Sequence, residues 1–160
     1  MKPPLRRLAV LFSRLSGYTS AALRALKDAY GVELLVFRWQ PAREAPFDRD
    51  QFTWIDALHD KKDQTGGEIV TTLEAFGPDA LLMSGWMDDD YLHAARHFKG
   101  RGVTVVAGSD AQWQGSWRQQ LARLAAPWYL HSAIDVLWVS GERQRQFAYR
   151  LGFTGPRCWS

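Results

Sequence analysis

Four short apolar runs, each ending at a serine or a glycine, constrain this chain more than any other feature of its sequence. They are LAVLFS ending at Ser13, ALLMSG ending at Gly85, VTVVAGS ending at Ser109 and VLWVSG ending at Gly141. Near-continuous apolar runs of this length are typical of parallel strands buried on both faces, and the carboxyl ends of such strands lie along one edge of their sheet. We expect these small polar residues to line a single crevice, and we place the function there.

The strand-like runs alternate with amphipathic helical segments, the pattern of right-handed βαβ units in a doubly wound α/β sheet. We predict strands at 8–12, 32–38, 52–57, 80–83, 103–107 and 134–139, and helices at 19–30, 68–76, 88–98 and 142–151. A further helical region carries Trp113, Trp117, Leu121 and Leu124 on one stripe until Pro127 interrupts it, and 40–45 is a loop. The strand order is then 3-2-1-4-5-6, which places the ligand between 13–18 and 84–86.

Composition narrows the class of protein. The 160 residues suit one domain, and the net charge of +3 is scattered, so it fits an anionic ligand or a peripheral membrane surface without requiring nucleic acid. The single cysteine, Cys158, and the lack of any metal-ligand spacing indicate a reducing, cytoplasmic setting and no metal. The apolar run at 8–12 is too short for a secretory leader or a membrane span.

Several residues near the predicted crevice are candidates for binding. The loop around Ser16 and Gly17 joins a strand to a helix, so its amides could hold a phosphate, although an ordinary turn explains it equally well. Ser84, Gly85 and Trp86 form a narrow turn whose ring could stack on a sugar or base, or could belong to the core.

Two carboxylates follow strand ends. Asp110 could accept a proton or a sugar hydroxyl, or cap the next helix, and Glu142 could simply complement the positive end of the last helix. His93 and His97 share one helix face, but without a third ligand they are best interpreted as surface residues.

Two segments together resemble a known family: SGWMDDDYLHAARHFKGRGVTVVAGSDAQWQG and IDVLWVSGERQRQFAYRLGF. They resemble the amino-terminal half of GT-B glycosyltransferases of family four, most strongly over 78–153. The resemblance implies that Ser16 and Gly17 stand at the family's glycine-rich loop and that Ser109 and Asp110 stand at its His-Asp pair, with serine replacing the histidine. It also implies that the turns of the family are kept at Ser84, Gly85, Ser140 and Gly141.

The resemblance implies a Rossmann-like domain spanning 1–160 that forms the acceptor side of a two-domain enzyme. Such an enzyme moves a sugar from a nucleotide-sugar donor to a hydroxyl acceptor and binds the donor in a carboxyl-terminal domain that is absent here. We expect this domain to hold no cofactor and to show no turnover alone. The alternatives are a flavodoxin-like or Rossmann-like module that binds a small anion, and an interaction domain that self-associates through its exposed interdomain face.

Overall fold

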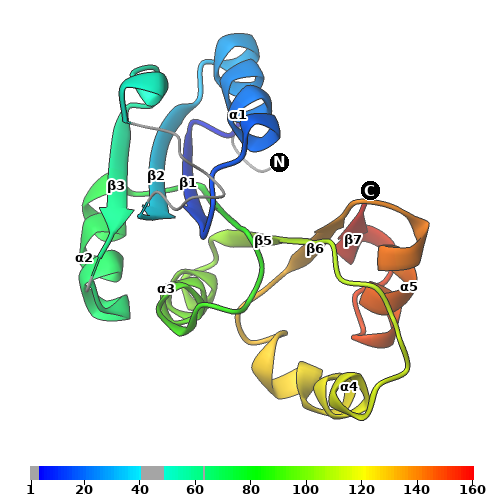
Figure 1. Cartoon of the computed structure of the whole chain (residues 1–160). Coiled ribbons are helices and arrows are strands. Elements are labelled where there is room, and N and C mark those ends of the chain that lie inside the picture. The colour runs from blue at the N-terminus through cyan, green and yellow to red at the C-terminus, as the bar shows by residue number, and fades with distance from the viewer. Residues whose placement is uncertain (1–3, 41–48, 63) are drawn as a thin grey trace.

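A computed structural model describes residues 4–40, 49–62 and 64–160 and shows a seven-stranded sheet flanked by helices (Figure 1). The predicted loop at 40–45 lies, beyond Gln40, outside the described residues. The strands are β1 (Arg7–Phe12), β2 (Glu33–Trp39), β3 (Ala57–Lys61), β4 (Ala80–Met83), β5 (Thr104–Ser109), β6 (Val136–Val139) and β7 (Cys158–Trp159). Their order is β3-β2-β1-β4-β5-β6-β7, and every pairing is parallel. The predicted doubly wound Rossmann-like fold is therefore confirmed.

Two strands differ from the sequence prediction. The third strand begins at Ala57 rather than ending there, because Phe52 closes a 3-10 turn, η1 (Arg49–Phe52), and both Phe52 and Ile55 are buried. The strand itself is polar and only half-buried because it lies at the edge of the sheet. The opposite edge carries β7, which the prediction omitted and which pairs with Leu137 and Trp138 of β6 after the 3-10 turn η2 (Gly155–Arg157).

Each of the first four helices begins at a side-chain cap. The helices are α1 (Gly17–Tyr30), α2 (Gly66–Phe76), α3 (Asp89–Gly100), α4 (Trp117–Tyr129) and α5 (Glu142–Arg150). Ser16, Thr65, Asp88 and Ser116 each accept a hydrogen bond from a backbone N–H in the first turn. Caps of this kind satisfy amides that have no partner within the helix, so the helix starts are defined locally by sequence.

The helical region around the tryptophans differs from its prediction. Trp113 lies before α4, where its ring packs 5.9 Å from the Phe147 ring, so it is not part of the helical stripe. Pro127 lies inside α4 rather than ending it. Among the described residues, no helix is long and apolar enough to cross a bilayer.

The core lies in two layers, one on each face of the sheet. Leu8, Val10 and Phe12 of β1 pack with Leu23 of α1, whereas the alternate β1 residues pack in a larger cluster with α2, α3, α4 and α5. Right-handed crossovers cause this division. From β1 to β3 the chain moves toward one edge of the sheet, and from β4 to β7 it moves toward the other, so the connecting helices of the two halves lie on opposite faces. The α1 face of β4, β5 and β6 therefore carries no helix of the described chain, and Trp138 there is 46% exposed.

Candidate functional site

A cavity of about 700 Å³ lies between α1 and the helix-free half of the sheet, at the carboxyl ends of the strands. Its volume is within the range of small-molecule sites. The residues that line it come from β1, α1, β4, β5, β6 and the turns after them: Phe12, Arg14, Tyr18, Thr19, Ala22, Leu23, Leu26, Leu82, Ser84, Gly108, Ser109, Asp110, Trp138, Val139 and Ser140.

Four polar residues of this cavity stand at strand ends. Ser84 follows β4, Ser109 ends β5, Asp110 comes directly after it, and Ser140 follows β6. Parallel pairing brings them to one edge, since Ser109 is opposite Val139 in the register of β5 and β6. Four of the residues that the sequence suggested therefore share one cavity.

The remaining walls are mostly apolar. Leu23 and Leu26 extend from α1, and Leu82 and Trp138 extend from the helix-free face of β4 and β6. The cavity thus combines an apolar body with hydroxyl and carboxylate groups at the strand ends, which is the usual chemistry of a site for an amphipathic small molecule.

Hydrogen bonds join the ends of β1 and β4, the two strands between which the strand order reverses. The Ser13 N–H donates to the Ser84 Oγ at 3.0 Å, and the two hydroxyl oxygens lie 3.3 Å apart. Gly85 follows with φ 132°, a conformation that side-chain-bearing residues rarely adopt. A smaller cavity of about 80 Å³ lies beside this turn and is lined partly by Trp39 and Asp88.

The loop predicted to hold a phosphate contains the start of α1. The Ser16 Oγ accepts from the Thr19 N–H at 3.3 Å and lies 3.0 Å from the Thr19 Oγ1, so this hydroxyl caps the helix. Gly17 is the first residue of α1, and a Cβ there would meet nothing within 4 Å. Both residues lie near the cavity wall but are not among the residues that line it.

Four other candidates lie outside the cavity lining, one of them Gly85, which lines the smaller cavity instead. Trp86 is half-buried and packs against the larger core cluster. Gly141 precedes α5, and Glu142 occupies its first turn, with a carboxylate oxygen 3.6 Å from Arg145 Nη1. The predicted helix start at Glu142 is confirmed.

The capping interpretation of Asp110 is wrong. The helix that follows begins at Trp117 and is capped by Ser116, and residues 111–116, between Asp110 and this helix, have no regular secondary structure. The Asp110 side chain is exposed at the cavity, and its backbone carbonyl accepts from Gln144 Nε2 at 3.4 Å.

The two histidines on α3 make separate contacts. His97 Nε2 lies 2.8 Å from Glu74 Oε1, whereas the His93 ring packs against Gly66. In the part of the chain that the structure describes, no group of three or more His, Cys, Asp or Glu side chains is placed to hold a metal ion.

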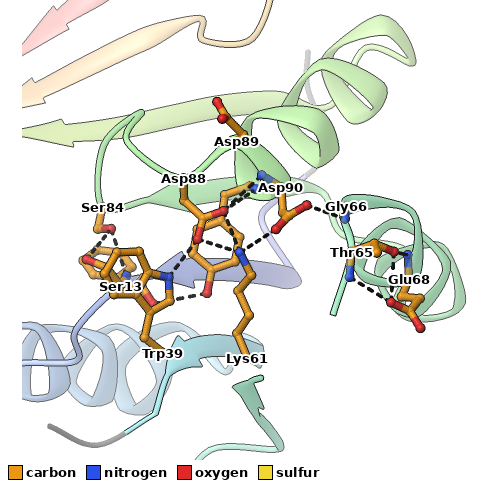
Figure 2. Close-up of polar contacts among 12 residues, drawn as sticks. Ser13, Trp39, Lys61, Thr65, Gly66, Glu68, Ser84, Asp88, Asp89 and Asp90 are labelled. Atoms are coloured by element: carbon orange, nitrogen blue, oxygen red, sulfur yellow. Dashed lines mark hydrogen bonds and ion pairs between the residues drawn. The ribbon is translucent and has the colours of Figure 1, made fainter. Parts of the chain in front are cut away.

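A polar cluster that the sequence did not suggest lies next to the switch point, which is the place between β1 and β4 where the strand order reverses (Figure 2). The Lys61 ammonium, at the end of β3, lies 2.8 Å from both carboxylate oxygens of Asp88 and 2.8 Å from Asp90 Oδ2. Asp88 also accepts from Trp39 Nε1 at 2.7 Å, and Asp90 accepts from the Gly66 N–H at 2.8 Å. The cluster joins β2, β3, α2 and α3.

The cluster is electrostatically satisfied. Burial by itself lowers the pKa of Lys61, but its hydrogen bonds to Asp88 and Asp90 outweigh that effect and leave the pKa raised. The hydrogen bond from Lys61 is the main reason that the pKa of Asp90 is lowered. Burial, followed by the charges of Asp88 and Asp90, raises the pKa of Tyr91. With three carboxylate contacts for its three N–H groups, Lys61 serves to fasten the elements around the switch point.

No protein-family model and no curated protein matches this chain. Solved structures match its fold at low identity. UDP-N-acetylglucosamine 2-epimerase from Rickettsia bellii is 13% identical, with a TM-score of 0.64 over 98% of this chain and 44% of that one. MurG from Acinetobacter baumannii is 10% identical, with a TM-score of 0.57 over 87% and 42%. L-threonine dehydrogenase from Clostridium difficile is 7% identical, with a TM-score of 0.58 over 84% and 53%.

This chain therefore spans about half the length of these proteins or less. The likeness establishes a Rossmann-like domain of the kind that forms one half of a GT-B-like protein. Because a dehydrogenase shares the fold, the fold alone does not determine the chemistry, which depends on the residues of the site.

Proposed function

We propose that this chain is the acceptor-side domain of a GT-B glycosyltransferase of family four, which transfers a sugar from a nucleotide-sugar donor to a hydroxyl acceptor. The observation that carries the proposal is the cavity of about 700 Å³ at the carboxyl edge of the sheet. Doubly wound sheets bind their ligands at this edge, next to the point where the strand order reverses. One of the structural neighbours, an epimerase of UDP-N-acetylglucosamine, supports a role with nucleotide sugars.

In this proposal the acceptor places its apolar body against Leu26, Leu82 and Trp138 and its hydroxyl group toward Asp110. During transfer, the acceptor oxygen forms a bond to the anomeric carbon of the sugar, and the bond from that carbon to the nucleotide diphosphate breaks. The diphosphate leaves with the electron pair, and the Asp110 carboxylate accepts the proton of the acceptor hydroxyl. The hydroxyl of Ser109 orients the acceptor.

The donor in this proposal is bound by a second domain that faces the carboxyl edge of the sheet. The 160-residue chain then binds the acceptor but does not consume the donor, because the groups that stabilise the departing diphosphate belong to the other domain.

Binding is tested by thermal denaturation of the 160-residue chain with a panel of alkyl and aryl glycosides. A ligand at 100 times its dissociation constant stabilises the folded state by about 2.7 kcal/mol, which raises the melting temperature of a chain of this size by roughly 5–10 °C. Leu26→Gln, in the cavity wall, should abolish this shift, whereas Tyr30→Gln, exposed on the same helix, should preserve it.

Turnover is tested with the two-domain protein and a set of nucleotide sugars. Asp110→Asn should reduce kcat at least tenfold and leave acceptor affinity nearly unchanged, because it removes the proton acceptor but keeps the shape of the side chain. Failure of a well-folded two-domain protein to consume any donor would contradict the proposal.

A second candidate, a non-catalytic module that binds a small anion, is favoured by one observation. Arg14 lies in the cavity wall with Tyr18 and Thr19 of the first turn of α1, and both a guanidinium and a helix start attract anions. Stabilisation by flavins or free nucleotides, with none by glycosides, would select this module over the acceptor domain.

A further inference from the structure

The helix α4 presents an apolar stripe to solvent. Trp117, Leu121, Leu124 and Trp128 have exposed fractions of 68%, 55%, 67% and 78%. At about 100° per residue, these positions fall within an arc of roughly 60° around the helix axis. Ala126, the only buried residue of α4, lies on the opposite side of the helix. The helix is thus attached to the protein by the face opposite its apolar stripe.

This orientation reverses the usual arrangement of a surface helix, in which the apolar stripe faces the core. A contiguous exposed stripe of large apolar side chains is typical of a surface that meets a partner or a membrane. In Figure 1, α4 lies at the periphery of the molecule, away from β1 and α1, and none of its residues lines the cavity. The stripe is therefore separate from the proposed acceptor site.

The charges on α4 favour one kind of partner. The helix sequence, WRQQLARLAAPWY, contains two arginines and no aspartate or glutamate. At 100° per residue, Arg118 falls on one side of the stripe and Arg123 on the other. The Arg118 guanidinium lies 5.6 Å from the centre of the Trp117 ring. At the end of α4, the Tyr129 hydroxyl donates a hydrogen bond to the Asp89 carboxylate at 3.3 Å.

We propose that α4 docks this domain on an anionic lipid bilayer, with the helix axis in the plane of the membrane. Leu121 and Leu124 enter the boundary between headgroups and acyl chains, and the tryptophan rings at the two ends of the stripe sit at headgroup level. Arg118 and Arg123 face the lipid phosphates on either side. The proposal does not depend on the sugar-transfer function.

A second copy of the chain fits this surface less well. A helix of 13 residues is about 20 Å long, and a narrow stripe of that length provides little of the roughly 1,200 Å² that a stable interface buries. In a symmetric dimer formed through the stripe, the arginines on its flanks would also approach the arginines of the other copy. Anionic lipid instead neutralises them.

The test is co-sedimentation of the 160-residue chain with vesicles of phosphatidylcholine alone or of equal parts phosphatidylcholine and phosphatidylglycerol. We expect binding to the anionic vesicles that weakens with added salt. The double variant L121Q/L124Q should bind at least about tenfold more weakly. The double variant R118Q/R123Q should lose roughly fivefold for each charge removed.

The matched control is the double variant R24Q/Y30Q, which removes one arginine and one aromatic ring from exposed positions on α1 and should bind like the parent. Circular dichroism confirms that each variant is folded. Equal binding to both vesicle types, no vesicle binding, or equal binding by parent and α4 variants would overturn the proposal. Self-association by light scattering that L121Q/L124Q abolishes, in the absence of vesicle binding, would assign the stripe to a second copy instead.

Discussion

Removal of the Asp88 carboxylate should destabilise the domain, because this side chain holds several elements together beside the point where the strand order reverses. Its side chain is 10% exposed and contacts Lys61, which is 11% exposed, and it also accepts from Trp39 and from two amides of α3. Asp88→Ala removes all of these contacts at once.

The magnitude follows from two contributions. Loss of an N-cap costs about 1 kcal/mol. Breaking a buried ion pair costs about 3–5 kcal/mol when the remaining charge has no partner. Lys61 keeps its contact with Asp90, so we assign about 2 kcal/mol to the loss of the ion pair between Lys61 and Asp88. The residue Trp39 is 40% exposed, so water replaces the hydrogen-bond acceptor that its indole N–H loses. The total of about 3 kcal/mol corresponds to a fall in melting temperature of roughly 6–12 °C for a chain of this size.

Urea and thermal denaturation, followed by circular dichroism, measure the effect. Asp89→Ala is the matched control, because Asp89 is in the next position, is exposed and points away from Lys61 in Figure 2. It should change the free energy of unfolding by less than about 0.5 kcal/mol. A cycle with Lys61→Met should give a coupling energy of at least about 1 kcal/mol with Asp88→Ala. A loss below about 1 kcal/mol, or additive effects in the cycle, would refute the reasoning.

Three further changes test the local geometry. Gly85→Ala should destabilise by about 1–3 kcal/mol in urea denaturation because of its φ of 132°, whereas Gly17→Ala, at an open helix start, should not destabilise. Thr65→Ala should cost about 1 kcal/mol because it removes the capping box of α2, and Thr65→Ser should retain stability; equal melting temperatures for the two variants would contradict this. The pKa of Asp90 is lowered from 3.8, chiefly by Lys61, so its contribution is present above pH 3.8 and is lost as the pH falls below it. Urea titrations across that range should show falling stability, and a rise on acidification would exclude this role.

The first central strand was predictable because a parallel strand buried on both faces must be apolar throughout, as the run ending at Ser13 shows: residues 8–12 of β1 are all buried. The edges of the sheet were not. At β3, the His59 ring stacks on the Phe37 ring, and Asp60 forms an ion pair with Arg38. The polar sequence of this strand therefore resembles that of an exposed loop, although one side of the strand is paired with β2. The two residues of β7 are too few to form a recognisable pattern.

The candidate site was predictable where it depends on strand ends. Ser84, Ser109, Asp110 and Ser140 share a cavity because parallel register places strand ends together. The Lys61 cluster could not be found in this way. Its partner Asp88 lies 27 positions away, and only the packing of α2 and α3 brings the two together.

The sequence alone determined the alternation of strands and helices, the parallel sheet and the edge at which small polar residues gather. These features depend on the apolar pattern of each strand and the cap of each helix, and both involve residues close together in the chain. Tertiary structure alone decided which helix faces turn inward. The amphipathic pattern of α4 is visible in the sequence, but its apolar stripe faces solvent because Ala126, on the opposite side, fills the space against the core. The direction of a helix face depends on the space its neighbours leave, and that space is set by the crossovers of the whole sheet.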